Sequence, residues 1–151
     1  MDLKKTLALG LALSGLAAFG AVDTSSFAKK MTITASGTFT SGVAAKLAEG
    51  ETITNFPVLV RLDATKVDYS NFLRPNGADI MFVQGEGDDA VRLPYEVQTW
   101  NPLGESLIWV KVPTLAVDTT FDLYFSSLTA SVENAPSDVW KSLIYCHRLP
   151  I

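Results

Sequence analysis

Alternation of apolar and polar residues is the feature that most limits the folds open to this chain. It runs through three segments, Asn55–Asp63, Val91–Trp100 and Glu105–Val112. Successive side chains of a strand point to opposite faces, so a period of two predicts strands with one buried face. In the first segment Phe56, Val58, Val60 and Leu62 share one face, and in the third Ser106, Ile108, Val110 and Val112 share one face. In the second segment Val91, Leu93, Tyr95 and Val97 are predicted to face inward.

Shorter strand-like runs complete the pattern, and no long segment has a helical period. These runs are Lys30–Ser36, Asp79–Gln84 and Thr119–Ser126, and turn residues lie at Asn76–Gly77, Gly85–Ala90 and Asn101–Gly104. Asp68 or Ser70 is expected to cap a short helix that ends before Pro75. Alternating strands joined by tight turns predict an all-β fold, an antiparallel β-sandwich of jelly-roll type.

The N-terminus is typical of a secretory signal peptide, which would begin as a helix. Lys4 and Lys5 precede the apolar, uncharged run Thr6–Phe19, and small residues allow cleavage after Gly20 or after Ala28. This run is shorter than the roughly 20 residues that a membrane-spanning helix needs. We predict a signal peptide at 1–28, a β domain at 29–135 and a tail at 136–151, in an exported protein of the periplasm, cell surface or extracellular space.

Composition supports a packed domain and limits the classes of partner that the chain is expected to bind. Of the 151 residues, 48% are hydrophobic and 19% charged, which is enough apolar material for a core. The net charge is -4 and there is no run of lysine and arginine, so nucleic acid is excluded as an expected partner. Cys146 is the single cysteine, so the chain has no intramolecular disulfide and must rely on core burial.

Four sequence blocks resemble the bacterial DUF2341 domain family: Asn55–Leu62, Asn76–Phe82, Leu93–Glu96 and Glu105–Pro113. The resemblance runs from about Lys29 to Tyr145. It implies a β-sandwich module of unknown function in exported proteins, without established catalytic residues. It also implies a neighbour, either a following concanavalin A-like lectin/glucanase domain or proton-channel components of the MotA/TolQ/ExbB type.

The C-terminal part departs from the family pattern. The last family strand ends in Tyr-Gly-Asn, where this chain has Tyr124–Ser127. The family continues through a tryptophan and a His-Leu or His-Met pair into the next domain, whereas here Val139–Trp140 is followed by Ile144–Ile151 and the end of the sequence. We therefore expect a truncated or frame-shifted gene product that lacks a downstream domain.

An outward-facing polar and aromatic surface is the main candidate for ligand binding. Its residues are Arg92, Glu96, Gln98, Trp109 and Lys111, and Trp100, Tyr95 and Tyr124 are further candidates for an aromatic platform. Flat aromatic rings stack on the C–H faces of sugars, while amide and carboxylate groups bind their hydroxyls. The structural alternative is that these aromatic residues pack between two sheets.

Glu96 also suggests a catalytic hypothesis. A glycosidase needs two carboxylates that flank one bond, and Glu105, across the Asn101–Gly104 turn, is the candidate partner. The alternative is a surface carboxylate paired with Arg92 or Lys111 across the sheet.

Acidic residues near the second predicted turn are the candidate metal ligands. Asp79, Glu86, Asp88 and Asp89 offer hard oxygen atoms that suit Ca²⁺, although their spacing matches no EF-hand loop and a solvated turn is the alternative. His147 is the single histidine and cannot form a metal cluster or triad alone. No other cofactor is expected.

Three functional hypotheses follow. The chain is a non-catalytic module for glycan recognition or adhesion, a glycan-acting hydrolase, or a structural spacer for a lectin-like or ExbB/TolQ-type partner. The expected partners are a glycan or a cell-surface protein, and contact with a membrane would arise only through an uncleaved signal or a partner protein.

Overall fold

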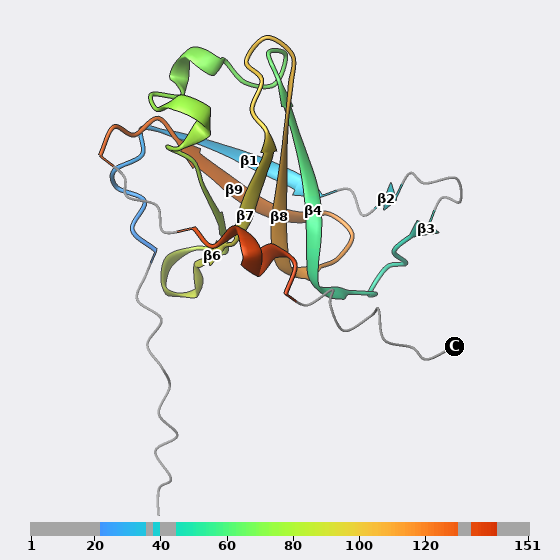
Figure 1. The fold of residues 1–151 in the computed structure, drawn as a ribbon. Coiled ribbons are helices and arrows are strands. Elements are labelled where there is room, and N and C mark those ends of the chain that lie inside the picture. Colours follow the sequence, from blue (N-terminus) through green and yellow to red (C-terminus); the bar gives the residue numbers. More distant parts are fainter. Residues whose placement is uncertain (1–21, 36–37, 40–44, 130–133, 142–151) are drawn as a thin grey trace, which may run out of the picture.

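The computed structural model describes residues 22–35, 38–39, 45–129 and 134–141, which are predominantly β (Figure 1). The strands are β1 (Lys29–Ala35), β2 (Thr38–Phe39), β3 (Ala45–Lys46), β4 (Ile53–Asp63), β5 (Met81–Gln84), β6 (Val91–Leu93), β7 (Tyr95–Thr99), β8 (Glu105–Leu115) and β9 (Thr119–Phe125). Single turns of 3-10 helix are η1 (Tyr69–Asn71), η2 (Pro75–Gly77), η3 (Gly87–Asp89) and η4 (Pro136–Val139). No helix in these ranges is long and apolar enough to cross a membrane.

Two antiparallel sheets form the body of the domain. The β9 sheet has the strand order β1-β9-β5-β6, and the β8 sheet has the order β4-β8-β7. A separate two-stranded ladder joins β2 to β3. In Figure 1, β1 and β9 cross behind β4, β7 and β8 rather than running along them. The predicted all-β class and antiparallel pairing are confirmed.

The predicted alternation places one core between the two sheets. In β8 four alternate residues are fully buried: Ser106, Ile108, Val110 and Val112. In β4 the exposed fraction is 5% for Val60 and 2% for Leu62. From the β9 sheet, Phe82, Phe121 and Leu123 enter the same cluster. Burial of such side chains typically stabilises a fold by about 1.5 to 3 kcal/mol each, so this shared core is the main source of stability.

The segment predicted as one strand, Val91–Trp100, divides at Pro94. Before this proline, β6 pairs with β5 in the β9 sheet; after it, β7 pairs with β8 in the other sheet. Pro94 has no N–H to donate, and its carbonyl accepts a hydrogen bond from the Lys111 amide at 2.9 Å. The chain therefore passes from one sheet to the other at Pro94. The prediction that Val91 faces inward is wrong, because Val91 is 48% exposed.

Several local predictions are confirmed. Asp68 caps η1 by accepting from the Ser70 amide, and the Asn101–Gly104 turn closes through a 3.2 Å hydrogen bond. Beyond the last strand, η4 lies against β7 and β8, and its residue Val139 is fully buried. The main part of the predicted signal peptide (1–21), together with Cys146 and His147, lies outside the described residues.

Candidate functional site

Four predicted ligand-binding residues gather on the outer face of the β8 sheet. Glu96 and Gln98 lie on β7, and Trp109 and Lys111 lie on β8. Glu96 is directly opposite Trp109 in the ladder, and a β-bulge between Val97 and Thr99 leaves Gln98 without a paired residue. Because alternate residues share a face, the same alternation that buries Ile108 and Val110 turns these four side chains outward.

Trp140, from the turn that follows η4, completes this group. Its indole Nε1 donates a hydrogen bond to Glu96 Oε2, and its ring centroid is 5.3 Å from that of Trp109 at an interplanar angle of 64°. Lys111 Nζ donates to the carbonyl oxygen of Asp138 at 3.0 Å. We call Glu96, Gln98, Trp109, Lys111 and Trp140 the outer-face cluster.

Many polar groups of the outer-face cluster are already hydrogen-bonded to other groups of the same chain. The indole N–H of Trp109 donates to Gln98 Oε1 at 2.7 Å, so each tryptophan has a hydrogen-bonded nitrogen. The edge-to-face ring pair and these bonds hold η4 on the sheet. The Gln98 side chain is exposed, and the other members are half-buried.

Arg92 does not join the outer-face cluster, which corrects the prediction that it shares a face with Glu96. It lies on β6, opposite Val83, and is exposed on the other sheet. The strand division at Pro94 is the cause. Glu96 therefore has Trp140 as its partner, where the sequence suggested Arg92 or Lys111.

Glu105 is engaged far from Glu96. Its two carboxylate oxygens accept from Arg61 Nε at 2.8 Å and Nη2 at 2.7 Å, and this guanidinium lowers the pKa of Glu105. Glu105 lies four residues along β8 from Trp109, the neighbour of Glu96. At about 3.3 Å per residue this is roughly 13 Å, beyond the roughly 5 to 9.5 Å that separates glycosidase carboxylates. Glu96 and Glu105 are therefore too far apart to act as the hypothesised catalytic pair.

The other predicted platform aromatics lie apart from the outer-face cluster. Trp100 packs edge-on against Phe72 at 4.9 Å and against Tyr69 at 5.5 Å between ring centroids. Tyr95 is buried, its hydroxyl donates to the Ile80 carbonyl at 3.0 Å, and burial raises its pKa to about 12. Tyr124 contacts Phe27, at 6.3 Å between ring centroids, on the β9 sheet.

The predicted metal ligands are divided between two ends of β5. Asp79 precedes the strand and is fully buried, and its Oδ2 accepts from the amides of Leu73 at 2.8 Å and Ser127 at 3.3 Å. Among the residues that the structure describes, none forms a hydrogen bond with its Oδ1. The other three residues, Glu86, Asp88 and Asp89, are exposed on the far loop. Within the described ranges, no group of three or more acidic, histidine or cysteine side chains is placed to hold a metal.

Sequence reasoning missed Trp140 as a member of the outer-face cluster and did not predict the role of Asp79. Trp140 was visible only as a family marker in the predicted tail, and its docking depends on a contact with a strand 44 residues earlier. Asp79 was predicted as a metal ligand, with a solvated turn as the alternative, whereas it is buried and accepts from the amides of Leu73, before β5, and Ser127, after β9. Its position just before the wholly apolar stretch Ile80–Val83 was the available signal of burial.

Comparison with known proteins gives one match, to a family model over part of the chain. Neither the curated proteins nor the solved structures contain a match. The family model described as "Domain of unknown function (DUF2341)" matches residues 76–142, which include β5 to η4 and the whole outer-face cluster. This confirms the predicted family over that stretch, while the resemblance between Lys29 and Pro75 stays a prediction. Over residues 76–142 this chain thus matches the DUF2341 family that its sequence was predicted to resemble.

Proposed function

We propose that the chain is an exported, non-catalytic β-sandwich module of a bacterial surface or secreted protein that recognises glycans through its outer-face cluster. The observation that carries this proposal is the Trp109–Trp140 ring pair, bordered by the carboxylate of Glu96 and the amide of Gln98. Aromatic rings with adjacent carboxylate and amide groups are the side chains that sugar rings require for stacking and hydroxyl binding.

The arrangement also indicates how binding would occur. The exposed Gln98 keeps its amide NH₂ for a sugar hydroxyl, since its oxygen is used by Trp109. A pyranose would stack on the half-buried rings beside it. Because the ring pair is fixed by hydrogen bonds to the sheet, little side-chain freedom would be lost on binding.

Sandwich architecture and export are parts of the same proposal. Two antiparallel sheets that share one core support a sandwich of jelly-roll type. The basic pair Lys4 and Lys5 before an apolar run supports a signal peptide and a place in the periplasm, on the cell surface or outside the cell.

A structural spacer is the second candidate. It is favoured by the engagement of the outer-face cluster with η4, since Glu96 and Lys111 bind the segment that ends at Lys141. In that role the outer-face cluster fixes the path of the chain as it leaves the sheet, which would orient a lectin-like or ExbB/TolQ-type neighbour.

A glycan array with the full chain separates these functions. We expect binding to at least one glycan, and a loss of at least tenfold in affinity for Trp109→Ala. Leu103→Ala is the matched control, because Leu103 is 101% exposed in the β7–β8 turn and away from the outer-face cluster. The proposal fails if no glycan binds with or without Ca²⁺, which leaves the spacer, or if Trp109→Ala binds as well as the unchanged chain.

A further inference from the structure

The segment before β1, residues 22–28, forms part of the folded domain and leads into the strand as the blue stretch in Figure 1. It begins with a turn. The Asp23 carboxylate accepts from the backbone amide of Ser25 at 2.9 Å and from the Ser25 hydroxyl at 2.7 Å. The Phe27 amide donates to the Thr24 carbonyl at 3.1 Å. Side-chain and backbone hydrogen bonds thus fix the path of the chain toward β1.

Two contacts attach this segment to β9 and its end. The Ala28 amide donates to the Ser126 carbonyl at 3.1 Å, which continues the β1–β9 ladder by one further pair. The Phe27 side chain is half-buried, and its ring meets Tyr124 edge-on with 6.3 Å between ring centroids. The segment therefore adds a backbone bond and an aromatic contact to the sheet.

The Phe27 ring lies on a face of the β9 sheet that the other sheet does not cover. Met81 of β5 is directly opposite Tyr124, and their neighbours Phe82 and Leu123 belong to the core between the sheets. Because alternate residues point to opposite faces, Met81 and Tyr124 point away from that core. Met81 is nevertheless only 1% exposed. Apolar cover is therefore needed on this outer face, where the contact with Tyr124 places Phe27.

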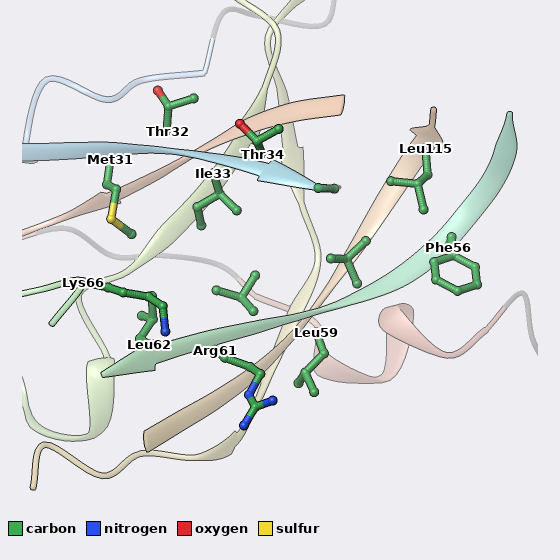
Figure 2. Close-up of a pocket in the computed structure, with 13 residues that line it drawn as sticks. Met31, Thr32, Ile33, Thr34, Phe56, Leu59, Arg61, Leu62, Lys66 and Leu115 are labelled. Atoms are coloured by element: carbon green, nitrogen blue, oxygen red, sulfur yellow. The ribbon is translucent and has the colours of Figure 1, made fainter. Parts of the chain in front are cut away.

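The strand that follows the segment is an edge strand with an incompletely covered inner face. Within the described part of the chain, β1 pairs only with β9. An apolar cleft of about 640 Å³ lies between β1 and β4, and Met31 and Ile33 point into it (Figure 2). Both side chains are half-buried, whereas Phe121 and Leu123 of β9 are almost fully buried. Since stabilisation scales with the apolar area that is buried, β1 depends more than β9 on contacts at its ends.

We propose that residues 22–28 stay in the mature protein, and that the peptidase of the export machinery cuts before them, at the bond between Gly20 and Ala21. The inference rests on export, which is part of the proposed function. In this hydrolysis water adds across the peptide bond, which leaves a carboxylate on Gly20 and an ammonium group on Ala21. The tripeptide Ala18-Phe19-Gly20 has the small residues that such a peptidase needs on either side of its middle position.

The second site that the sequence allows, after Ala28, would remove structure from the domain. A cut there takes away the Phe27 ring and the amide that binds Ser126, and it leaves Lys29, the first residue of β1, as the new N-terminus. Proteolytic cleavage also concentrates in backbone that is exposed and not tied down, whereas Ala28 is already hydrogen-bonded to the end of β9. A cut after Gly20 breaks none of these contacts.

The N-terminus of the exported chain tests the proposal directly. The full chain is produced in a bacterium with a general secretory pathway, and the exported fraction is analysed by intact mass and N-terminal sequencing. We expect a chain that begins at Ala21. An exported chain with any other first residue, Lys29 above all, overturns this inference and leaves export intact. An unprocessed chain that stays in the cytoplasm overturns both this inference and the export on which it rests.

Hydrogen exchange measures the structural role of the segment. A chain of residues 29–151 should exchange its β1 amide hydrogens at least tenfold faster than a chain of residues 21–151. In the longer chain Phe27→Ala should also speed this exchange, while Ser26→Ala, an exposed neighbour, is the matched control and should leave it unchanged. Equal exchange in the two chains, or in the two variants, overturns the argument for retention. If the shorter chain does not fold, the comparison of the two variants decides.

Discussion

A single glycine shows how closely the turn before β5 is packed. Gly77 has a φ of +64°, and a Cβ built on it would lie 2.5 Å from Cζ3 of Trp100. Gly77→Ala should therefore destabilise the protein through both a left-handed backbone and a clash with a ring that packs on Phe72. We expect a loss of roughly 2 to 4 kcal/mol in the free energy of unfolding, measured by urea denaturation.

Gly87 provides the matched control for the backbone term. Its φ is +58°, but no atom lies within 4 Å of the position that a Cβ would take. Gly87→Ala should lower the free energy of unfolding by only about 1 to 2 kcal/mol, because alanine disfavours the left-handed backbone conformation. Equal losses for the two variants would show that the contact with Trp100 contributes nothing.

Tyr95 should make stability depend on alkaline pH. Burial raises its pKa to about 12, above the value of about 10 in an unfolded chain. The native state thus binds the phenolic proton more tightly, so this contribution is complete below pH 10 and is lost as the pH rises through 12. It is on the order of 2 to 3 kcal/mol.

Urea unfolding between pH 8 and pH 12, compared with Tyr95→Phe, isolates this effect. The variant loses the hydrogen bond to the Ile80 carbonyl and should be about 1 kcal/mol less stable at pH 8. Its disadvantage should shrink or reverse toward pH 12. A constant difference across the range would mean that the Tyr95 pKa is unchanged by folding.

At the scale of elements, the attachment of η4 to the β8 sheet depends on few contacts. Trp140→Phe keeps an aromatic ring against Trp109 but removes the N–H that Glu96 accepts, and Glu96→Ala removes the acceptor. Since the two changes break one hydrogen bond, a double-mutant cycle should give a coupling of about 1 kcal/mol. Thermal or urea unfolding measures it. The pair Trp140→Phe and Leu103→Ala should be additive, and additivity in the Glu96 pair would refute the attachment.

The elements themselves were mostly predictable, because alternation is a local signal. In β8 the four residues that share the apolar face are all buried, whereas in β4 Val60 and Leu62 are buried and Phe56 and Val58 are half-buried. The choice of sheet was not predictable, because it depends on non-local pairing. Arg92 and Glu96 are four positions apart and would share a face in one continuous strand. They lie on different sheets because the strand divides at Pro94.

The candidate site follows the same division between local and non-local information. Alternation alone turned Glu96 and Trp109 to one face, where the structure places them opposite each other. The docking of Trp140 could not be read from the sequence, since it joins residues 44 positions apart. Asp79 also shows this limit: its burial and its two backbone donors, Leu73 and Ser127, depend on segments that are not adjacent to it in the sequence.

For the whole molecule, the arrangement of the two sheets implies a single cooperative unit. The continuous chain through Pro94 links them on one side, and one hydrophobic cluster draws residues from both. The three tryptophans lie on the β8 side, at the end of β7, on β8 and after η4, so their fluorescence reports that sheet.

Leu123→Ala tests whether the two sheets unfold together. Leu123 is a fully buried residue of β9, and so belongs to the sheet that the tryptophans do not report. Removing its side chain should cost about 2 to 5 kcal/mol through lost burial and the cavity that remains. Tryptophan fluorescence and far-ultraviolet circular dichroism should follow one urea transition, displaced equally to lower concentration. If the fluorescence midpoint stayed in place while the dichroism midpoint fell, the sheets would be independent units. Coincident, equally displaced transitions would mean that a defect in β9 weakens the face that carries Trp109.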